Sequence, residues 1–462
     1  MEGMSLAEVS QALGARLVEG ENSEAIYPTG GSIDSRTLQS DEIFFALPGE
    51  QADGHQYVSK AISAGASASV VTTEWYERQS SRPPGPLLLV EAPDLALGEL
   101  GKQYRQRFQI PLIGITGSTG KTTTKEMTAS VLSTRHNVFS TEGNRNNRLG
   151  LPLTLLGLSS KHDVAVIEMG ISEHGGMKYL SEIADPTIGV ITNIGPTHLE
   201  FLGSVEGVAK AKGELLEYLD ESSMAILNLD DLYLSKEQAR LKGRLLGFGI
   251  EKICQFRGEG LVFDREGCGQ FSLQSRKFQL SVPGRHNVYN ALAATAAGSE
   301  LDVPIEEAAQ ALASFRPPSL RGQLLERDGI RLLNDVYNAN PASMQAALVT
   351  ISEMSVTGSG RRVAVLGDML ELGETAAELH RELGAFAANH NLDFLFALGV
   401  HAEDVASGWV EGGQSPEQAN VFECRDTLVE ALKELLAAGD LVVVKGSRGL
   451  AMEKIVEALD FL

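Results

Sequence analysis

The stretch from Pro111 to Thr124, PLIGITGSTGKTTT, predicts a buried strand, a glycine turn and the start of a helix. Glycines let backbone N–H groups approach phosphate oxygens, the helix start adds partial positive charge, and Lys121 adds a full charge. Thr122 has the position of a Mg²⁺ ligand in such loops. Because Ile115 stands where the strict motif has its first glycine, the stretch predicts a phosphate-binding loop of a particular subtype.

The composition restricts the class of protein. A chain of 462 residues is long enough for two to four domains of roughly 150 residues each. Its net charge of -22 argues against a nucleic-acid partner or a membrane surface. The three cysteines lack CxxC spacing and predict neither a disulfide framework nor a zinc site. The N-terminus does not resemble a targeting segment and no long apolar run occurs, so we expect a cytoplasmic protein without membrane insertion.

Alternating strand and helix patterns predict a small N-terminal α/β domain at residues 1–106. A second domain, at 107–316, has continuous apolar runs that end in polar residues, which is typical of a parallel sheet covered by helices on both faces. These runs span 164–168, 188–193 and 224–228. Residues 253–282 alternate with period two and contain glycines, which predicts an antiparallel piece at the edge of this domain.

The segment Phe315–Ser319, FRPPS, is the clearest linker signal in the chain. Beyond it, four strand candidates separated by helices predict another parallel sheet, and they lie at 331–334, 363–366, 394–398 and 441–444. Residues 317–462 therefore predict a third, Rossmann-like domain. The expected fold class is α/β with three domains, the central one resembling a P-loop ATPase.

Polar residues at strand ends are the first candidates for a site, since parallel sheets place ligand groups there. Glu168 could hold Mg²⁺ beside the phosphate loop, or could be an acid at a solvent edge. His198 follows another strand end, where a lone histidine is usually structural or solvated. Asp335 ends the first strand of the third domain and suits either a ribose hydroxyl or a buried turn.

Other candidates are less specific. Lys212 lies on a helical segment and, taken by itself, is a surface lysine. Asn144, Asn146 and Asn147 form a cluster with two arginines, at 145 and 148, which suits either a loop facing phosphate or substrate or an ordinary polar turn. The stretch 284–290 leads into an alanine-rich helix, and Asn287 could simply cap that helix.

These pieces together resemble the ATP-dependent Mur ligases of peptidoglycan synthesis, with folylpolyglutamate synthase as a more distant relative. The resemblance covers nearly the whole chain in the family's order: SIDSRT, FFALPG, DGHQYV, ITGSTGKTTT, GNRNNRLGLP, IEMG, TNIGPTHLE, AKAKGE, GRHNVYNALAA and NDVYNANP. It implies a UDP-sugar-nucleotide-binding domain at 1–106, an ATP-binding domain at 107–316, and a domain at 317–462 that closes over ATP and binds an incoming dipeptide.

Three further motifs separate members of the family. The Asn-Pro-Arg-type signature that selects diaminopimelate is absent, whereas YNANP at 337–341, LGDMLELG at 366–373 and VKGSRG at 444–449 resemble the ligase of the last cytoplasmic step. That member adds D-alanyl-D-alanine to UDP-N-acetylmuramoyl-tripeptide through an acyl phosphate, forms ADP, and gives the UDP-pentapeptide precursor of peptidoglycan. The resemblance implies this activity, and we expect a monomer.

The resemblance also implies roles for individual residues. Lys121, Lys212, His198 and Glu168 would be catalytic, with Lys212 carrying a carbamate. ATP would be bound by Gly117, Ser118, Thr119, Gly120, Lys121, Thr122, Thr123, Asn287, Arg321 and Asp335. Two Mg²⁺ ions would be held by Thr122, Glu168, His198 and Lys212. The substrates would be bound by Ser35, Arg36, Asn144, Asn147, Asn338 and Asn340.

Two kinds of alternative stay open. Within the enzyme class, the chain could add the third amino acid or extend a folate chain, although the missing signature and the extra N-terminal domain count against these activities. In a different class, it could be a nucleotide-gated switch that forms no bond. A switch would need neither a sugar-nucleotide domain nor a set of residues for two metal ions.

Overall fold

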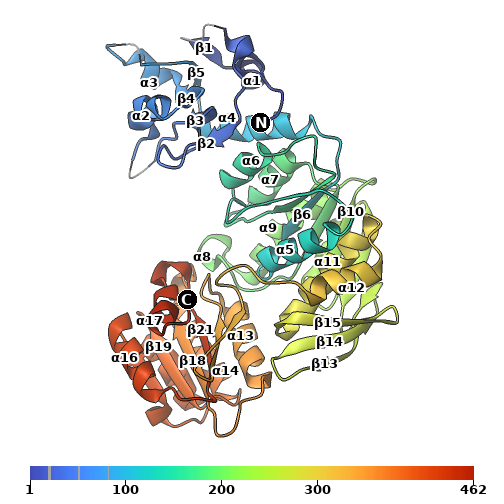
Figure 1. Ribbon diagram of the computed structural model, residues 1–462, viewed down its shortest axis with the longest axis vertical. Coiled ribbons are helices and arrows are strands. Elements are labelled where there is room, and N and C mark those ends of the chain that lie inside the picture. Colours follow the sequence, from blue (N-terminus) through green and yellow to red (C-terminus); the bar gives the residue numbers. More distant parts are fainter. Residues whose placement is uncertain (19–21, 50–51, 82) are drawn as a thin grey trace. The chain divides into compact units, whose positions relative to one another are not determined.

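The computed structural model describes residues 1–18, 22–49, 52–81 and 83–462 (Figure 1). The chain forms two compact units, each assembled from separate segments. One comprises Met1–Gly114, His136–Ile171 and Gly175–Gly189, and the other comprises Ile115–Arg135, Ser172–His174 and Val190–Leu462. The α/β class is confirmed, whereas the domain boundaries at 106 and 316 stay a prediction. Among the described residues, no helix combines the length and apolar character needed to cross a bilayer.

The N-terminal sheet has five strands in the order β1-β5-β4-β3-β2, and only the β1–β5 pair is antiparallel. Its strands are β1 (Arg16–Val18), β2 (Gly30–Ser32), β3 (Glu42–Phe45), β4 (Ala68–Thr72) and β5 (Leu87–Val90). Its helices are α1 (Leu6–Ala12), α2 (Val58–Ser63), α3 (Thr73–Glu77) and α4 (Pro93–Arg105). Strands β1 and β2 span three residues each, which is too short for a recognisable pattern of apolar positions.

The largest sheet has seven strands in the order β12-β11-β10-β9-β6-β8-β7. They are β6 (Leu112–Thr116), β7 (Val138–Ser140), β8 (Val164–Glu168), β9 (Ile188–Ile191), β10 (Met224–Asn228), β11 (Arg244–Gly249) and β12 (Phe256–Arg257). The helices between and after them are α5 (Lys121–Leu132), α6 (Gly150–Leu155), α7 (Gly176–Ala184), α8 (Leu199–Leu202), α9 (Val205–Tyr218), α10 (Leu234–Glu237), α11 (Arg285–Glu300) and α12 (Ile305–Ala313). Strands β8 and β10 match the predicted residues because every position in them is buried.

A small antiparallel sheet follows, as the period-two pattern predicted. Its strands are β13 (Glu259–Phe263), β14 (Cys268–Leu273) and β15 (Arg276–Pro283), in that order. Along most of β15, buried and exposed positions alternate, so the sheet has one face against the protein and one face toward solvent.

The C-terminal sheet has six strands in the order β16-β17-β21-β18-β19-β20, all parallel except β16. They are β16 (Gln323–Arg327), β17 (Ile330–Asn334), β18 (Arg362–Gly367), β19 (Phe394–Leu398), β20 (Ala419–Phe422) and β21 (Leu441–Lys445). The helices are α13 (Pro341–Glu353), α14 (Ala376–Ala388), α15 (Ala402–Glu411), α16 (Arg425–Leu435) and α17 (Glu453–Ala458). The edge strands β16 and β20 were not predicted, because none of their side chains is fully buried.

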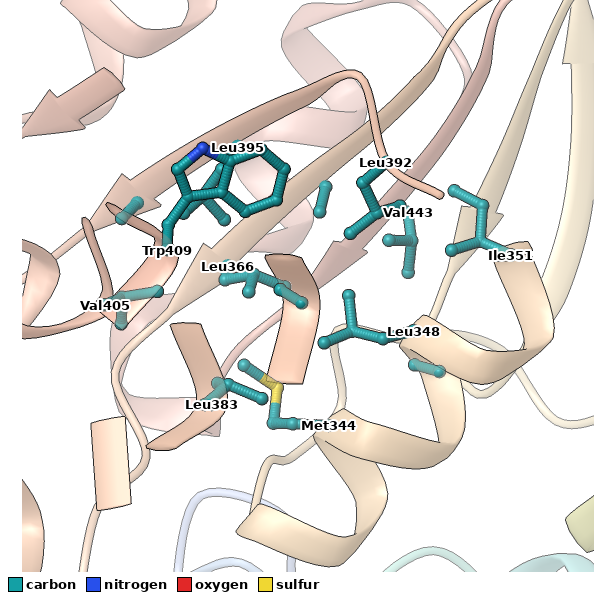
Figure 2. Close-up of a cluster of buried hydrophobic side chains, with 14 of the residues drawn as sticks. Met344, Leu348, Ile351, Leu366, Leu383, Leu392, Leu395, Val405, Trp409 and Val443 are labelled. Atoms are coloured by element: carbon teal, nitrogen blue, oxygen red, sulfur yellow. The ribbon is translucent and has the colours of Figure 1, made fainter. Parts of the chain in front are cut away.

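Two apolar cores cover the two faces of this sheet. On one face, Leu366 and Val443 pack with Met344 of α13, Leu383 of α14 and Trp409 of α15 (Figure 2). On the other face, strand residues pack with α16 and α17. Helices on both faces leave the carboxyl ends of the parallel strands as the place where polar side chains can gather.

Candidate active site

The predicted phosphate loop has the backbone conformation that its glycines allow. Gly117 has φ +148°, and a Cβ added there would lie 1.9 Å from the Thr192 hydroxyl oxygen. Gly120 has φ +78° and is the N-cap residue of α5, and no described side chain caps that helix start. A helix start without a side-chain cap is a typical place for an anion, and the loop has no room for side chains at these glycines.

A second segment, residues 192–195, holds the loop in place. The Asn193 carboxamide oxygen accepts hydrogen bonds from the Thr119 N–H and hydroxyl, both at 3.0 Å, and the Thr192 hydroxyl donates to the Thr119 carbonyl at 2.6 Å. The Ser118 N–H donates to the Asn193 carbonyl at 2.9 Å. The sequence reasoning gave Asn193 no role, although its place at a strand end within TNIGPTHLE was a usable signal.

Two lysines dominate the electrostatics beside this loop. Lys121 folds over it, and its ammonium donates to the carbonyls of Gly117 at 2.8 Å and Ser118 at 3.4 Å. Lys212 on α9 is fully buried, so its interpretation as a surface lysine was wrong. Burial lowers the pKa of Lys212 well below its usual range, and the positive charge of Lys121 lowers that pKa further. Its surroundings therefore disfavour the charged form of this side chain.

Helix α11 contacts α5 through two asparagines. The Asn290 carboxamide oxygen accepts from the Thr124 hydroxyl at 3.1 Å, and its nitrogen donates to the Asn287 oxygen at 3.0 Å. Asn287 donates back to the Pro283 carbonyl at 2.7 Å. The N-cap of α11 is Gly284, so the capping role considered for Asn287 was wrong. Asn287 is instead a buried member of a hydrogen-bonded chain that leads to the phosphate-loop helix.

Within the first unit, Glu168 is 2% exposed at the end of β8, so the solvent-edge interpretation was wrong. Its carboxylate accepts from the Asn146 side chain at 2.7 Å, and its N–H donates to the Thr141 hydroxyl at 3.0 Å. Asn144 is exposed. The Asn147 side-chain oxygen accepts from the Gly150 N–H at 2.9 Å and so supports the start of α6.

The predicted nucleotide-sugar residues lie after β2. Ser35 is buried, and Arg36 is exposed. The Arg36 guanidinium forms a two-pronged pair with Asp34, at 2.9 Å from Nε and 2.6 Å from one terminal nitrogen. These hydrogen bonds lower the pKa of Asp34 to about 2. Asp34 therefore holds Arg36 close to the backbone of its own loop.

His198 has an unusual backbone and a carboxylate partner. Its φ is +52°, in the left-handed region that few residues other than glycine adopt, and it is the N-cap residue of α8. Its Nδ1 lies 2.6 Å from Glu371, and this hydrogen bond lowers the pKa of Glu371. His198 and the LGDMLELG segment are therefore joined directly.

The carboxyl ends of β17 and β21 form a second polar cluster. Lys445 is buried, and its ammonium donates to the Asp335 carboxylate at 2.6 Å, the Asp335 carbonyl at 3.3 Å and the Asn338 carbonyl at 2.9 Å. Asn340 is the N-cap of α13, and its side-chain nitrogen lies 3.4 Å from the Ser118 carbonyl oxygen. Lys445 thus joins two of the residues predicted for the third domain, Asp335 and Asn338.

Two arginines lie near one aromatic ring in the same cluster. The guanidinium carbon of Arg321 is 3.6 Å from the ring centroid of Tyr337, and that of Arg448 is 5.9 Å away. These are cation–π distances. The sequence reasoning quoted Tyr337, Lys445 and Arg448 only as parts of motifs, since their contacts join segments that are far apart in the chain.

The predicted metal ligands do not form a cluster of the side chains that usually bind metal ions. The described residues contain no group of three or more His, Cys, Asp or Glu side chains that could hold a metal ion. The predicted set has only two such residues, Glu168 and His198, and its other members are a hydroxyl and a lysine. A metal site built on this set would need oxygen ligands from the substrates, water or a modified Lys212.

Comparison with protein-family models supports the order of the segments. Three models match consecutive parts of the chain. They are the Mur ligase family catalytic domain at residues 29–104, the Mur ligase middle domain at 115–298, and the Mur ligase glutamate ligase domain at 320–448. A protein of Bacillus subtilis named UDP-N-acetylmuramoyl-tripeptide--D-alanyl-D-alanine ligase is 37% identical over 435 residues, which is 93% of each chain.

Solved structures agree with this match. MurF from Acinetobacter baumannii superimposes with a TM-score of 0.87 at 29% identity, over 99% of this chain and 98% of that one. MurF ligase from Thermotoga maritima, solved in complex with ADP, has a TM-score of 0.80 at 28% identity and covers 93% of this chain and 97% of its own. With family models over all three segments and a relative of such identity and coverage, the chain belongs to the Mur ligase family.

Proposed function

We propose that this protein joins D-alanyl-D-alanine to UDP-N-acetylmuramoyl-tripeptide, with ATP converted to ADP and phosphate. The observation that carries the proposal is the likeness, over 93% of both chains, to a relative named for this reaction. That likeness includes the C-terminal segment, where the family member would select its incoming substrate. The ADP in the Thermotoga maritima complex supports ATP as the nucleotide.

The chemistry requires an activated carboxyl group, because a free carboxylate has no good leaving group. The γ-phosphoryl group of ATP passes to the terminal carboxylate of the tripeptide and gives an acyl phosphate and ADP. The uncapped start of α5 and the charge of Lys121 suit the phosphate oxygens during this transfer. The dipeptide amine then attacks the acyl carbon, loses a proton, and the tetrahedral intermediate releases phosphate to leave an amide.

The residues present fit the Mg²⁺ ions that the family implies. The Thr122 hydroxyl and the Glu168 carboxylate are hard oxygen donors of the kind that Mg²⁺ prefers. Bound Mg²⁺ would neutralise charge on the phosphate oxygens. His198 could act as a ligand through Nε2 while its Nδ1 keeps the hydrogen bond to Glu371, since a metal-binding histidine commonly has a carboxylate on its other ring nitrogen.

A carbamate on Lys212 also fits its surroundings. Carbamate formation joins a neutral amine to CO₂ with loss of a proton, and the lowered pKa of Lys212 favours the neutral amine. The product is an anionic oxygen ligand, which would place a negative charge at a fully buried position that already feels the positive charge of Lys121. We infer that Lys212 supplies its part of the metal site in this form.

The remaining predicted residues belong to substrate binding in this proposal. Ser35 and Arg36 would contact the uridine diphosphate, with Asn144 and Asn147 along the substrate, while Asn287, Arg321 and Asp335 would bind the nucleotide. Asn338 and Asn340 would bind the dipeptide.

We place the domain boundaries near residues 106 and 316, and the third domain closes over ATP so that water does not reach the acyl phosphate. The enzyme would act as a cytoplasmic monomer.

Phosphate release in a fixed order of addition tests this function. The purified protein is mixed with ATP, Mg²⁺ and UDP-N-acetylmuramoyl-tripeptide, and D-alanyl-D-alanine is added last. We expect release to begin with the dipeptide and a UDP-pentapeptide to appear by mass spectrometry. Release that responds instead to a single amino acid and a UDP-dipeptide would assign the preceding ligation, and no response to either set would refute a ligase.

A further inference from the structure

The proposed reaction leaves one charge of the incoming dipeptide without a partner. D-alanyl-D-alanine reacts through its amine, and its terminal carboxylate stays anionic throughout. A buried or half-buried carboxylate needs a cation or several hydrogen-bond donors, since its desolvation is otherwise unfavourable. The question, which rests on the proposed function, is therefore which cation on the C-terminal sheet is available to it.

Three cationic side chains meet around the Asp335–Asn340 segment. Lys445 is excluded because its three ammonium protons already have oxygen acceptors within the segment. Arg321 stacks on Tyr337 and is the arginine that the resemblance assigns to the phosphates of ATP. Arg448 is the third, and the resemblance does not assign it to ATP or to the metal ions.

Arg448 is accessible and only partly paired. Its side chain is 56% exposed, and one terminal nitrogen donates to Glu453 at 3.0 Å. A guanidinium has five N–H donors, so this single contact leaves an edge for a second carboxylate. The Glu453 pair also limits the directions in which that edge can point.

The backbone before Arg448 is tied to both loops that border this cluster. The Ser447 N–H donates to the Asp368 carbonyl at 3.0 Å, and the Ser447 hydroxyl accepts from the Leu370 N–H at 3.0 Å. The same hydroxyl lies 3.4 Å from the Ala339 carbonyl oxygen. The backbone at Arg448 is thus fixed between the YNANP and LGDMLELG motifs, which are two of the three motifs that distinguish this member of the family.

We propose that Arg448 binds the terminal carboxylate of the incoming dipeptide and selects for it. A planar guanidinium can meet both carboxylate oxygens with parallel N–H groups, which a lysine ammonium cannot. Ligands that lack the negative charge leave the arginine edge unsatisfied and bind more weakly. Arg448 would thereby reject dipeptide amides and dipeptides that are already extended at their carboxyl end.

The experiment compares D-alanyl-D-alanine with D-alanyl-D-alaninamide as acceptors for wild type, Arg448→Met and Arg448→Lys. The control is Arg381→Met, since Arg381 is also about half exposed and paired with one glutamate, Glu411. In wild type and in the control, we expect a strong preference for the acid. In Arg448→Met, we expect the KM for the acid to rise roughly 10- to 100-fold while the KM for ATP stays within about twofold.

The acid-to-amide ratio of kcat/KM is the decisive readout, because a general loss of structure would lower both values together. We expect that ratio to fall close to one in Arg448→Met and to be intermediate in Arg448→Lys, which keeps the charge without the planar fork. An unchanged ratio in Arg448→Met overturns the proposal, and Arg448→Lys with a wild-type ratio does so if the methionine variant does not fold. Wild type that ligates neither acceptor would refute the proposed function itself.

Discussion

Lys212 and Lys445 are two buried lysines in opposite circumstances. Lys445 lies at the end of β21, where a carboxylate and two carbonyls accept its three protons. Lys212 lies on α9, where no described oxygen is recorded as its hydrogen-bond partner and the nearest charge that acts on it is the like charge of Lys121. One site is built for an ammonium ion, and the other disfavours it.

The difference separates a structural lysine from a reactive one. An ammonium group whose protons all have oxygen acceptors links the segments that supply those acceptors. Lys445 in this way joins Asp335 to Asn338 at the edge of the C-terminal sheet. An ammonium without such partners loses its proton more easily and becomes a nucleophile. Burial alone is therefore a poor guide to the role of a lysine, and the oxygen atoms around it decide.

The largest expected effect comes from removing the charge that faces Lys212. Lys121→Ala should lower kcat by at least about a thousandfold, because the phosphate oxygens lose their nearest cation during transfer. Circular dichroism should show an unchanged fold, since Lys121 is only half-buried and its ammonium donates to carbonyls of its own loop. A variant that keeps most of its turnover would contradict the assignment of the phosphate loop.

Lys445→Met should have the next largest effect, which we expect in the free energy of unfolding. The substitution leaves the Asp335 carboxylate without its cation, and we expect a loss of about 2–4 kcal/mol in the free energy of unfolding, reduced because Asp335 keeps some access to water. Urea denaturation measures this loss. Lys454→Met, at an exposed position on α17, is the matched control and should change stability by less than about 0.5 kcal/mol. Equal effects of the two substitutions would contradict the structural role of Lys445.

Lys212→Met should act in the opposite direction on stability while it abolishes activity. Because the folded pKa of Lys212 lies below its value of 10.5 in the unfolded chain, the unfolded state binds the extra proton and folding is opposed at neutral pH. In buffer without CO₂, we expect the variant to be more stable than wild type by about 1–3 kcal/mol at pH 7.

The pH dependence of this difference in stability tests whether the lowered pKa of Lys212 is its cause. Wild-type stability should rise with pH up to the unfolded pKa, whereas the methionine variant lacks this contribution. The difference between the two proteins in urea denaturation should therefore shrink between pH 7 and pH 10. A wild type that is more stable than the variant at pH 7 would show that Lys212 has oxygen partners like those of Lys445.

The smallest expected effect concerns the ring beside the arginines. Tyr337→Leu removes the surface on which Arg321 stacks, and we expect the KM for ATP to rise roughly two- to fivefold, as suits a cation–π contact of about 0.5–1 kcal/mol. Tyr337→Phe keeps the ring and should behave like wild type in the same assay. If both variants behave alike, the stacking does not position Arg321.

Local pattern was sufficient for the parts of the molecule in which neighbouring residues decide the structure. The strand, glycine turn and helix of residues 111–124 were predicted from their spacing, and β8 and β10 from continuous apolar runs. The edge strands β16 and β20 were missed because their partly exposed side chains carry no such run. The α/β class followed from the alternation of these elements.

Side-chain roles that depend on distant segments could not be predicted in this way. Lys445 meets Asp335 across 110 positions of sequence, and Asn193 meets Thr119 across 74. Lys212 looked like a surface lysine because nothing in its own helix signals full burial, and only the resemblance to a family suggested another role. The spacing of residues in the sequence predicts a single helix or strand, whereas the site combines side chains from the ends of several helices and strands.

The first compact unit has a consequence for how the chain is made. Its three segments run from Met1 to Gly189 and are interrupted by Ile115–Arg135, the segment that carries the phosphate loop. Residue 189 must therefore be synthesised before the unit is complete, which takes roughly 10 to 40 seconds at about 5–20 residues per second. The phosphate-loop segment is translated before the unit that it interrupts can be completed.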